Sequence, residues 1–139
     1  MKIVIDSSVW IAAIGSQKGF ASQIIFESCK KAEIEIFISN QILDEVALNL
    51  EKKLKFDKTL AQRARIVVKN LCDLEMEITP DEEEKIRKIK YNSDKHILAL
   101  CRKIQADYLI TFDRKHLLPL KKYGQTVILE PKDFIKEIK

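Results

Sequence analysis

Two aspartates each follow a short apolar run of the kind that forms a buried strand. Asp6 comes directly after residues 3–5, and Asp113 comes two residues after the run 108–111. In a parallel sheet covered by helices, ligands bind beyond the carboxyl ends of the strands. We therefore expect the two carboxylates to lie at that edge of the sheet, where they could bind a cation or act on a substrate.

A third acid lies on the apolar stripe of a predicted helix. Residues 92–104 carry Ile97, Leu98, Cys101 and Ile104 at helical spacing, and Asp94 precedes them on the same face. Burying an unpaired carboxylate is costly, so this position needs a functional or structural reason. Because the helix leads into the strand at 108–111, Asp94 falls at the opposite sheet edge unless the helix points back toward the crevice. The periodicity leaves this open.

Clustered carboxylates predict a particular metal chemistry. They repel one another, and their pKa values rise unless a cation is present. Mg²⁺ and Mn²⁺ prefer oxygen ligands, and such ions can activate water and stabilise charge on a phosphoryl group. An acidic site without cysteine or histidine ligands therefore points to Mg²⁺ or Mn²⁺ and to hydrolysis of phosphodiester bonds. Most of the 21 acids in the chain must nevertheless be solvated surface groups.

Short apolar strands alternate with helices along the chain, and this order predicts a parallel sheet with helices on both faces. The predicted strands are 2–5, 36–38, 108–111 and 127–129. Helices are expected at 9–14, 20–31, from Ser39 to about residue 54, after Asp57, from Thr79, at 92–104 and from Pro131.

The starts of these helices carry recognisable capping residues. Ser39 and Asp57 are predicted N-caps, Thr79 and Glu82 form a predicted capping box, and Asn92 or Ser93 is expected to cap the helix that contains Asp94. The helix after Asp57 is predicted to turn one apolar face inward, formed by Leu60, Ala64, Val67, Val68 and Leu71.

Composition is consistent with one domain spanning residues 1–139, since 46% of the residues are hydrophobic and can form a core. A net charge of +4 permits a nucleic-acid partner without demanding one. Cys29, Cys72 and Cys101 are odd in number and lack metal-ligand spacing, which indicates reduced core thiols in a cytoplasmic protein. We expect neither a signal peptide nor contact with a membrane, because no apolar run is long enough.

Four short segments, in order, resemble the PIN domain family, most closely the ribonuclease toxins of toxin–antitoxin pairs. The opening IVIDSSVWIAA matches the family's first acid at Asp6, and SNQILDEV matches the second at Glu45. The segment SDKHILALCRKIQADYLITFD matches the third and fourth acids at Asp94 and Asp113. The choice of Glu45 over Asp44 comes from the resemblance, because the helical pattern does not distinguish them.

The resemblance implies a fold, an activity and partners. The fold would be an α/β three-layer sandwich with a central, mostly parallel sheet and helices on both faces. Asp6, Glu45, Asp94 and Asp113 would be the catalytic acids and would bind one or two Mg²⁺ or Mn²⁺ ions. The activity would be endonucleolytic cleavage of RNA, with an antitoxin protein as partner and a homodimer as the assembly.

Other polar residues near these acids are candidates for substrate binding. The resemblance matches Ser8 and Thr111 to small polar neighbours of the first and last acids. Arg114 and Lys115 follow Asp113 and could contact phosphates, although a solvated loop explains them equally well.

The two histidines are interpreted as structural or surface residues, because metal-activated water makes a general base unnecessary. His116 lies where some family members carry a fifth acid, and the absence of that acid leaves the number of metal ions open.

Other classes of protein also place an aspartate after the first strand. A response-receiver fold needs a further acidic pair and a late lysine, and a haloacid-type phosphatase needs an acid at the position of Ser8; neither pattern is present. A PIN nuclease of RNA processing and a catalytically silent binding module both stay open. The sequence assigns no role to residues 52–90.

Overall fold

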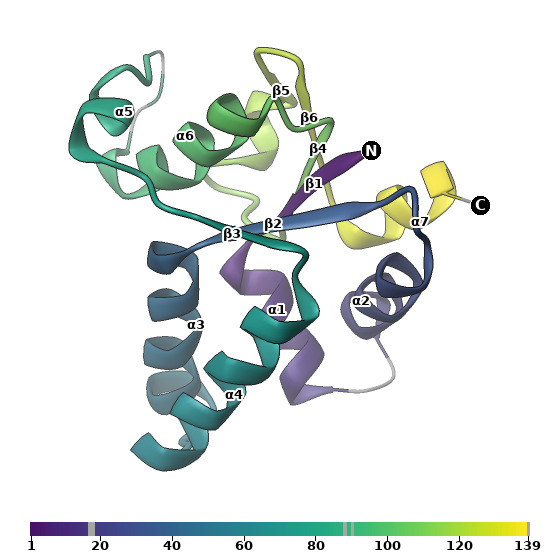
Figure 1. The fold of residues 1–139 in the computed structure, drawn as a ribbon, viewed down its shortest axis with the longest axis vertical. Coiled ribbons are helices and arrows are strands. Elements are labelled where there is room, and N and C mark those ends of the chain that lie inside the picture. The colour runs from purple at the N-terminus through teal and green to yellow at the C-terminus, as the bar shows by residue number, and fades with distance from the viewer. Residues whose placement is uncertain (17–18, 88, 90, 139) are drawn as a thin grey trace.

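The computed structural model describes residues 1–16, 19–87, 89 and 91–138, and its centre is a six-stranded sheet in the order β3-β2-β1-β4-β6-β5 (Figure 1). Five strands run parallel: β1 (Lys2–Ile5), β2 (Glu35–Ser39), β3 (Leu74–Met76), β4 (Tyr108–Ile110) and β6 (Thr126–Leu129). The edge strand β5 (Lys122–Tyr123) pairs antiparallel with β6. This confirms the predicted mostly parallel sheet.

The strand order reverses beside β1. In register, Val4 pairs with Phe37 of β2 on one side and with Leu109 of β4 on the other. Chain connections therefore leave the carboxyl ends of β1 and β4 in opposite directions, and a crevice opens between them, which is where such sheets bind ligands. Asp6 follows the end of β1, and Asp113 follows the end of β4.

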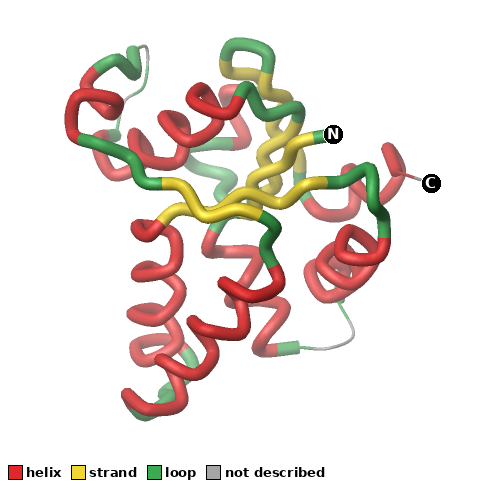
Figure 2. Tube along the Cα trace, in the orientation of Figure 1, coloured by secondary structure: helices red, strands yellow, loops and turns green. Residues whose placement is uncertain are grey.

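Helices cover both faces of the sheet (Figures 1 and 2). On one face α5 (Pro80–Glu84) packs with α6 (Lys95–Ile104). The other helices form a connected group through the pairs α1–α2, α1–α3, α3–α4 and α2–α7. They are α1 (Ser7–Gly15), α2 (Phe20–Lys30), α3 (Asn40–Lys53), α4 (Lys58–Leu71) and α7 (Pro131–Ile138), and two short 3-10 helices, η1 (Asn92–Asp94) and η2 (Leu118–Leu120), complete the set of described elements.

Three predicted caps are confirmed. Ser39 Oγ accepts a hydrogen bond from the amide of Ile42 at 3.3 Å, and Asp57 Oδ1 accepts one from Leu60 at 2.8 Å. Thr79 and Glu82 form both bonds of the capping box. The predicted cap at Asn92 or Ser93 is wrong, because these residues form η1 and α6 follows it without a side-chain cap.

The predicted inner face of α4 is only partly correct. Val68 is 2% exposed and Ala61 is fully buried, whereas Leu60, Val67 and Leu71 are 42–57% exposed. The reason is that α4 packs mainly on α3, at the periphery of the molecule, so the rest of its apolar stripe has no layer to cover it. Periodicity identifies an apolar stripe but does not say how much of it is covered.

Two strands were not predicted. β3 has the sequence LEM and begins the short alternation Leu74-Glu75-Met76-Glu77-Ile78, a strand signal that was missed, whereas β5 has only two residues and carries no alternation. β3 and β5 are the two edge strands of the sheet, where strand pairing depends on tertiary contacts.

Of the three cysteines, Cys101 is buried with a free thiol and Cys72 is half-buried, whereas the side chain of Cys29 lies outside the described residues. Among the described helices, none combines the length and apolar character that crossing a membrane requires.

Candidate metal centre

Asp6 is held at the carboxyl end of β1 by one hydrogen bond of its backbone amide and three of its carboxylate. Its backbone amide donates to the carbonyl of Ile110, which fixes the end of β1 beside β4. The carboxylate caps α1: Oδ1 accepts from the Ser7 amide at 2.8 Å, while Oδ2 accepts from Thr111 Oγ1 at 2.7 Å and from Ser8 Oγ at 2.9 Å. Burial, which leaves the residue 7% exposed, raises the pKa of Asp6, and these bonds only partly offset the effect.

Ser8 and Thr111 connect the first strand to the loop after β4. Each hydroxyl donates its proton to Asp6 and accepts from a backbone amide of the loop, that of Phe112 to Ser8 at 3.1 Å and that of Asp113 to Thr111 at 3.0 Å. Both side chains therefore position the acids around them, a role distinct from the substrate contacts expected from the sequence.

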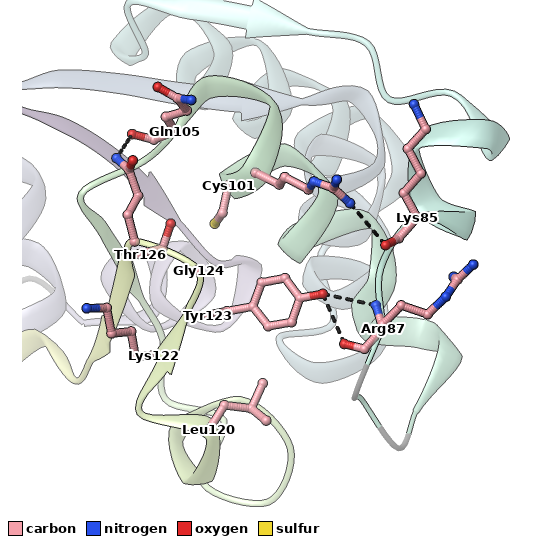
Figure 3. Close-up of a pocket in the computed structure, with 11 residues that line it drawn as sticks. Lys85, Arg87, Cys101, Gln105, Leu120, Lys122, Tyr123, Gly124 and Thr126 are labelled. Atoms are coloured by element: carbon pink, nitrogen blue, oxygen red, sulfur yellow. Dashed lines mark hydrogen bonds between the residues drawn. The ribbon is translucent and has the colours of Figure 1, made fainter.

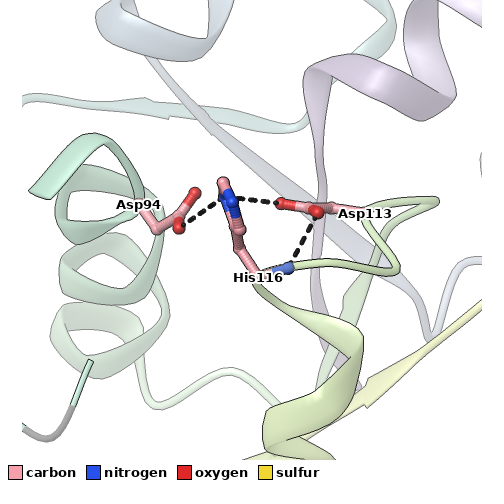
Figure 4. A group of neighbouring side chains, drawn as sticks. All are labelled: Asp94, Asp113 and His116. Atoms are coloured by element: carbon pink, nitrogen blue, oxygen red, sulfur yellow. Dashed lines mark hydrogen bonds and ion pairs between the residues drawn. The ribbon is translucent and has the colours of Figure 1, made fainter. Parts of the chain in front are cut away.

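Asp94, Asp113 and His116 form one cluster (Figure 4). His116 Nδ1 lies 3.3 Å from Asp94 Oδ2 and 3.7 Å from Asp113 Oδ2, and one potential ligand atom from each residue lies within 4.8 Å of the others. The amides of Lys115 and His116 donate to Asp113 Oδ1 at 3.1 and 3.0 Å. The Tyr91 ring stacks on the imidazole with centroids 3.6 Å apart, which fixes the orientation of His116.

The position of Asp94 resolves the question of the sheet edge. A helix that connects parallel strands runs antiparallel to them, so the start of α6 lies at the edge where the strands end. Asp94 immediately precedes α6 and therefore shares an edge with Asp6 and Asp113. Partial burial raises the pKa of Asp94, as do the charges of Asp113 and Asp6, while His116 lowers it.

Glu45 projects from α3 into the same region, and the adjacent Asp44 does not. Glu45 Oε1 lies 2.6 Å from His96 Nε2, whereas Asp44 is 73% exposed and pairs with Arg65 at 3.1 Å. Burial alone would lower the pKa of His96, but the close contact with the Glu45 carboxylate outweighs burial and raises that pKa. His96 and His116 are thus both in contact with the acids of the cleft.

All four predicted acids line one cleft of about 320 Å³. Asp94 and Asp113 lie close enough to share a ligand with His116, while Asp6 and Glu45 lie outside that closest group. Two further cleft residues, Asn49 and Lys53, were missed by the sequence reasoning. Their spacing of four and eight residues from Glu45 places all three on one face of α3, and this polar stripe was the available signal.

Arg114 and Lys115, the two cations expected to contact phosphates, differ in their surroundings. Arg114 Nε donates to Glu130 Oε1 at 2.9 Å, so its guanidinium is engaged at the end of β6. Lys115 has an exposed side chain and lines a second hollow of about 260 Å³, together with Asp94 and His116.

The donor set fits a divalent cation. The site contains four carboxylates, two histidines and Lys53. Carboxylate oxygens together with one imidazole suit Mn²⁺, whereas carboxylate oxygens alone suit Mg²⁺. Buried Glu45 Oε1 has no hydrogen-bond donor in good geometry among the described residues, and its neighbour is His96 Nε2. Burial and neighbouring carboxylates raise the pKa values of Asp6 and Asp94, and a bound cation would oppose both effects.

Solved structures of similar fold include several toxins and toxin–antitoxin complexes. VapC20 of Mycobacterium tuberculosis, described as a toxin that cleaves the Sarcin-Ricin loop, is 18% identical, with a TM-score of 0.63 over 88% of this chain and 97% of that chain. VapBC2 of Rickettsia felis, solved with a DNA fragment from its promoter, is 16% identical, with a TM-score of 0.70 over 94% and 98%. VapBC-1 of nontypeable Haemophilus influenzae is 14% identical, with a TM-score of 0.64 over 95% and 99%.

At such low identity these likenesses establish the fold alone. No curated protein sequence matches the chain. The family model described as "PIN domain" matches residues 2–115, which is most of the chain and includes all four acids. The chain therefore belongs to the PIN domain family.

Proposed function

We propose that this protein is a metal-dependent endoribonuclease that hydrolyses RNA phosphodiester bonds in the cytoplasm, and that it acts as the toxin of a toxin–antitoxin pair. The observation that carries the proposal is the convergence of Asp6, Glu45, Asp94 and Asp113 in one cleft at the switch point of a parallel sheet. Membership of the PIN family and the likeness to VapC toxins support it.

Each residue has a distinct role in this proposal. Asp94, Asp113 and His116 would hold a Mg²⁺ or Mn²⁺ ion, and Asp6 and Glu45 would complete the negative site. When bound, such an ion activates water and stabilises charge on the phosphoryl group.

The remaining residues of the cleft would hold the acids and the substrate in place. Ser8 and Thr111 orient Asp6 and the loop that carries Asp113. Lys53 and Lys115, which lie at the cleft and the adjoining hollow, would contact substrate phosphates, whereas Arg114 is held by Glu130.

The test of the proposal is cleavage of single-stranded RNA by the purified protein. We expect cleavage with Mg²⁺ or Mn²⁺, loss of cleavage in EDTA, and recovery when Mn²⁺ is added back. Asp94→Asn is expected to lower the rate by at least about 100-fold, because loss of a direct ligand should exceed the effect of losing a supporting contact. Asp44→Asn, which alters an exposed acid of the same α3, is the matched control. Cleavage that persists in EDTA, or in Asp94→Asn, contradicts the proposal.

An antitoxin partner and a homodimer belong to the same proposal. VapBC complexes of similar fold support the antitoxin, and the exposed apolar side chains of α4 supply a surface for contact with another chain. Expression of the protein should arrest bacterial growth, and the product of a small adjoining reading frame should relieve the arrest. Growth unaffected by the active nuclease would favour a role in RNA processing instead.

A further inference from the structure

A cavity of about 800 Å³ lies away from the acidic cleft (Figure 3). It lies between the end of α6 and the β5–β6 hairpin, with Gln105 and Thr126 among its lining residues. Because α6 ends and β6 begins at the amino edge of the sheet, this cavity opens at the edge opposite to Asp6. Its volume is within the range of ordinary ligand pockets.

Four cations surround this cavity without a carboxylate among its lining residues: Lys85, Arg87, Arg102 and Lys122. None of the four takes part in an ion pair within the described residues; Arg102 Nη1, for example, donates to the carbonyl of Lys85 at 3.0 Å. Uncompensated positive charge around a low-dielectric hollow attracts anions.

The inside of the cavity is apolar and carries a fixed aromatic ring. Tyr123 Oη accepts from the amide of Arg87 and donates to its carbonyl, each at 3.0 Å, so the ring is held in place beside the hollow (Figure 3). Cys101, at the other side of the hollow, is neutral at physiological pH, because burial raises the pKa of its thiol. An aromatic face with cations around it is the arrangement that binds a nucleotide of a single strand by stacking and phosphate contact.

A smaller hollow joins this cavity to the acidic cleft. The hollow of about 260 Å³ shares Leu120 with the basic cavity, and it shares Asp94 and Leu117 with the acidic cleft. The three depressions therefore adjoin one another along α6 and η2. A strand that ran along α6 from the acids would pass this hollow and reach the basic cavity.

We propose that the basic cavity binds a nucleotide of the substrate RNA strand a few positions from the bond that is cleaved. This inference rests on the proposed ribonuclease function and adds a second contact with the substrate. It predicts that RNA long enough to reach from Asp94 to Tyr123 binds more tightly than RNA that fills the acidic cleft alone.

The test measures binding in EDTA, where no cleavage occurs, by fluorescence anisotropy with labelled single-stranded RNA of about 3 and about 12 nucleotides. Lys85→Glu combined with Lys122→Glu removes two cations whose side chains make no hydrogen bond or ion pair among the described residues. Lys58→Glu combined with Arg63→Glu, on exposed positions of α4, makes the same change in net charge and is the control. Thermal melting checks that both variants are folded.

We expect the cavity variant to bind the longer RNA at least about tenfold more weakly. The slope of log affinity against log salt should become smaller in magnitude by about 1.4, because two phosphate contacts are lost. The short RNA and the control variant should change by less than about twofold. Equal losses for both RNAs, an equal loss in the control, or no loss at all would overturn the proposal.

Two further arms separate the remaining explanations. If adenosine monophosphate alone saturates the cavity and the longer RNA gains no affinity from it, the site binds free nucleotides and the strand assignment is overturned. Because binding is measured without metal or cleavage, a failure of the nuclease proposal in the Asp94→Asn cleavage test stays distinguishable from a failure here.

Discussion

The four acids of the cleft are held by three kinds of contact, from hydroxyls, backbone amides and histidines. Asp6 is bound by hydroxyls, Asp113 by backbone amides, Asp94 by His116 and Glu45 by His96. A substitution at one supporting group should therefore disturb the acids that this group contacts and leave the others in place.

Thr111 offers the sharpest example. Thr111→Val removes the donor to Asp6 and the acceptor for the Asp113 amide, both at a buried position. We expect unfolding to become easier by about 1–3 kcal/mol and RNA cleavage to fall about 10–100-fold. Ser22→Ala is the matched control, because that hydroxyl on α2 donates to the Ala13 carbonyl away from both the acids and the basic cavity. It should cost similar stability in urea melts without lowering cleavage; equal loss of cleavage in both variants would show that stability alone explains the effect.

His116 permits a test that does not depend on cleavage. If Nδ1 coordinates the ion with Asp94 and Asp113, His116→Gln should weaken Mn²⁺ binding about 10-fold, measured by electron paramagnetic resonance of free Mn²⁺. His116→Asp should restore binding, since it supplies an oxygen ligand at the same position. Undiminished binding in His116→Gln would limit His116 to orienting the neighbouring carboxylates.

The contact between His96 and Glu45 joins the helix α6 to the helix α3. The raised pKa of His96 means that the folded protein binds this proton more tightly than the unfolded chain does. The resulting stability is fully present below the ordinary value of 6.5 and is lost as pH rises through the raised pKa of the folded state.

We therefore expect the melting temperature of the metal-free protein to fall as pH rises above 6.5, because the ion pair then loses its proton. Raised pKa values of Asp6 and Asp94 act in the same direction at lower pH, since protonation of these acids also favours the folded state. His96→Gln should flatten the upper part of this dependence in differential scanning fluorimetry. A slope unchanged by His96→Gln would assign it to other groups.

Neighbouring valines of α4 test how far that helix is covered. Val68 is 2% exposed and Val67 57% exposed. Val68→Ala should destabilise the protein by about 2 kcal/mol in urea unfolding, whereas Val67→Ala should change stability by no more than about 0.5 kcal/mol. A large cost at Val67 would mean that another chain covers this face under the conditions of the measurement.

For the molecule as a whole, the sequence predicts the fold class because apolar runs and caps are local signals. The three central strands and the caps at Ser39, Asp57 and Thr79 carry such signals, and the structure contains them. β5 is set by its pairing with β6, because its two residues carry no periodicity, whereas β3 begins a short alternation from Leu74 to Ile78 that could have predicted a strand.

The same distinction applies to the site. Asp6 and Asp113 could be placed by the rule for strand ends, and Asp94 could have been placed too, because a connecting helix returns to the edge where the strands end. Contacts between distant segments, such as those of His96 and His116 with the acids, have no signal in the spacing of either histidine.

Titration calorimetry of Mn²⁺ into chelator-stripped protein tests most directly whether the acids at this sheet edge converge to bind a divalent cation. The account predicts that wild-type protein and Asp44→Asn bind Mn²⁺ alike, while Asp94→Asn binds at least about tenfold more weakly. Wild-type protein that binds Mn²⁺ no more tightly than Asp94→Asn does would contradict it.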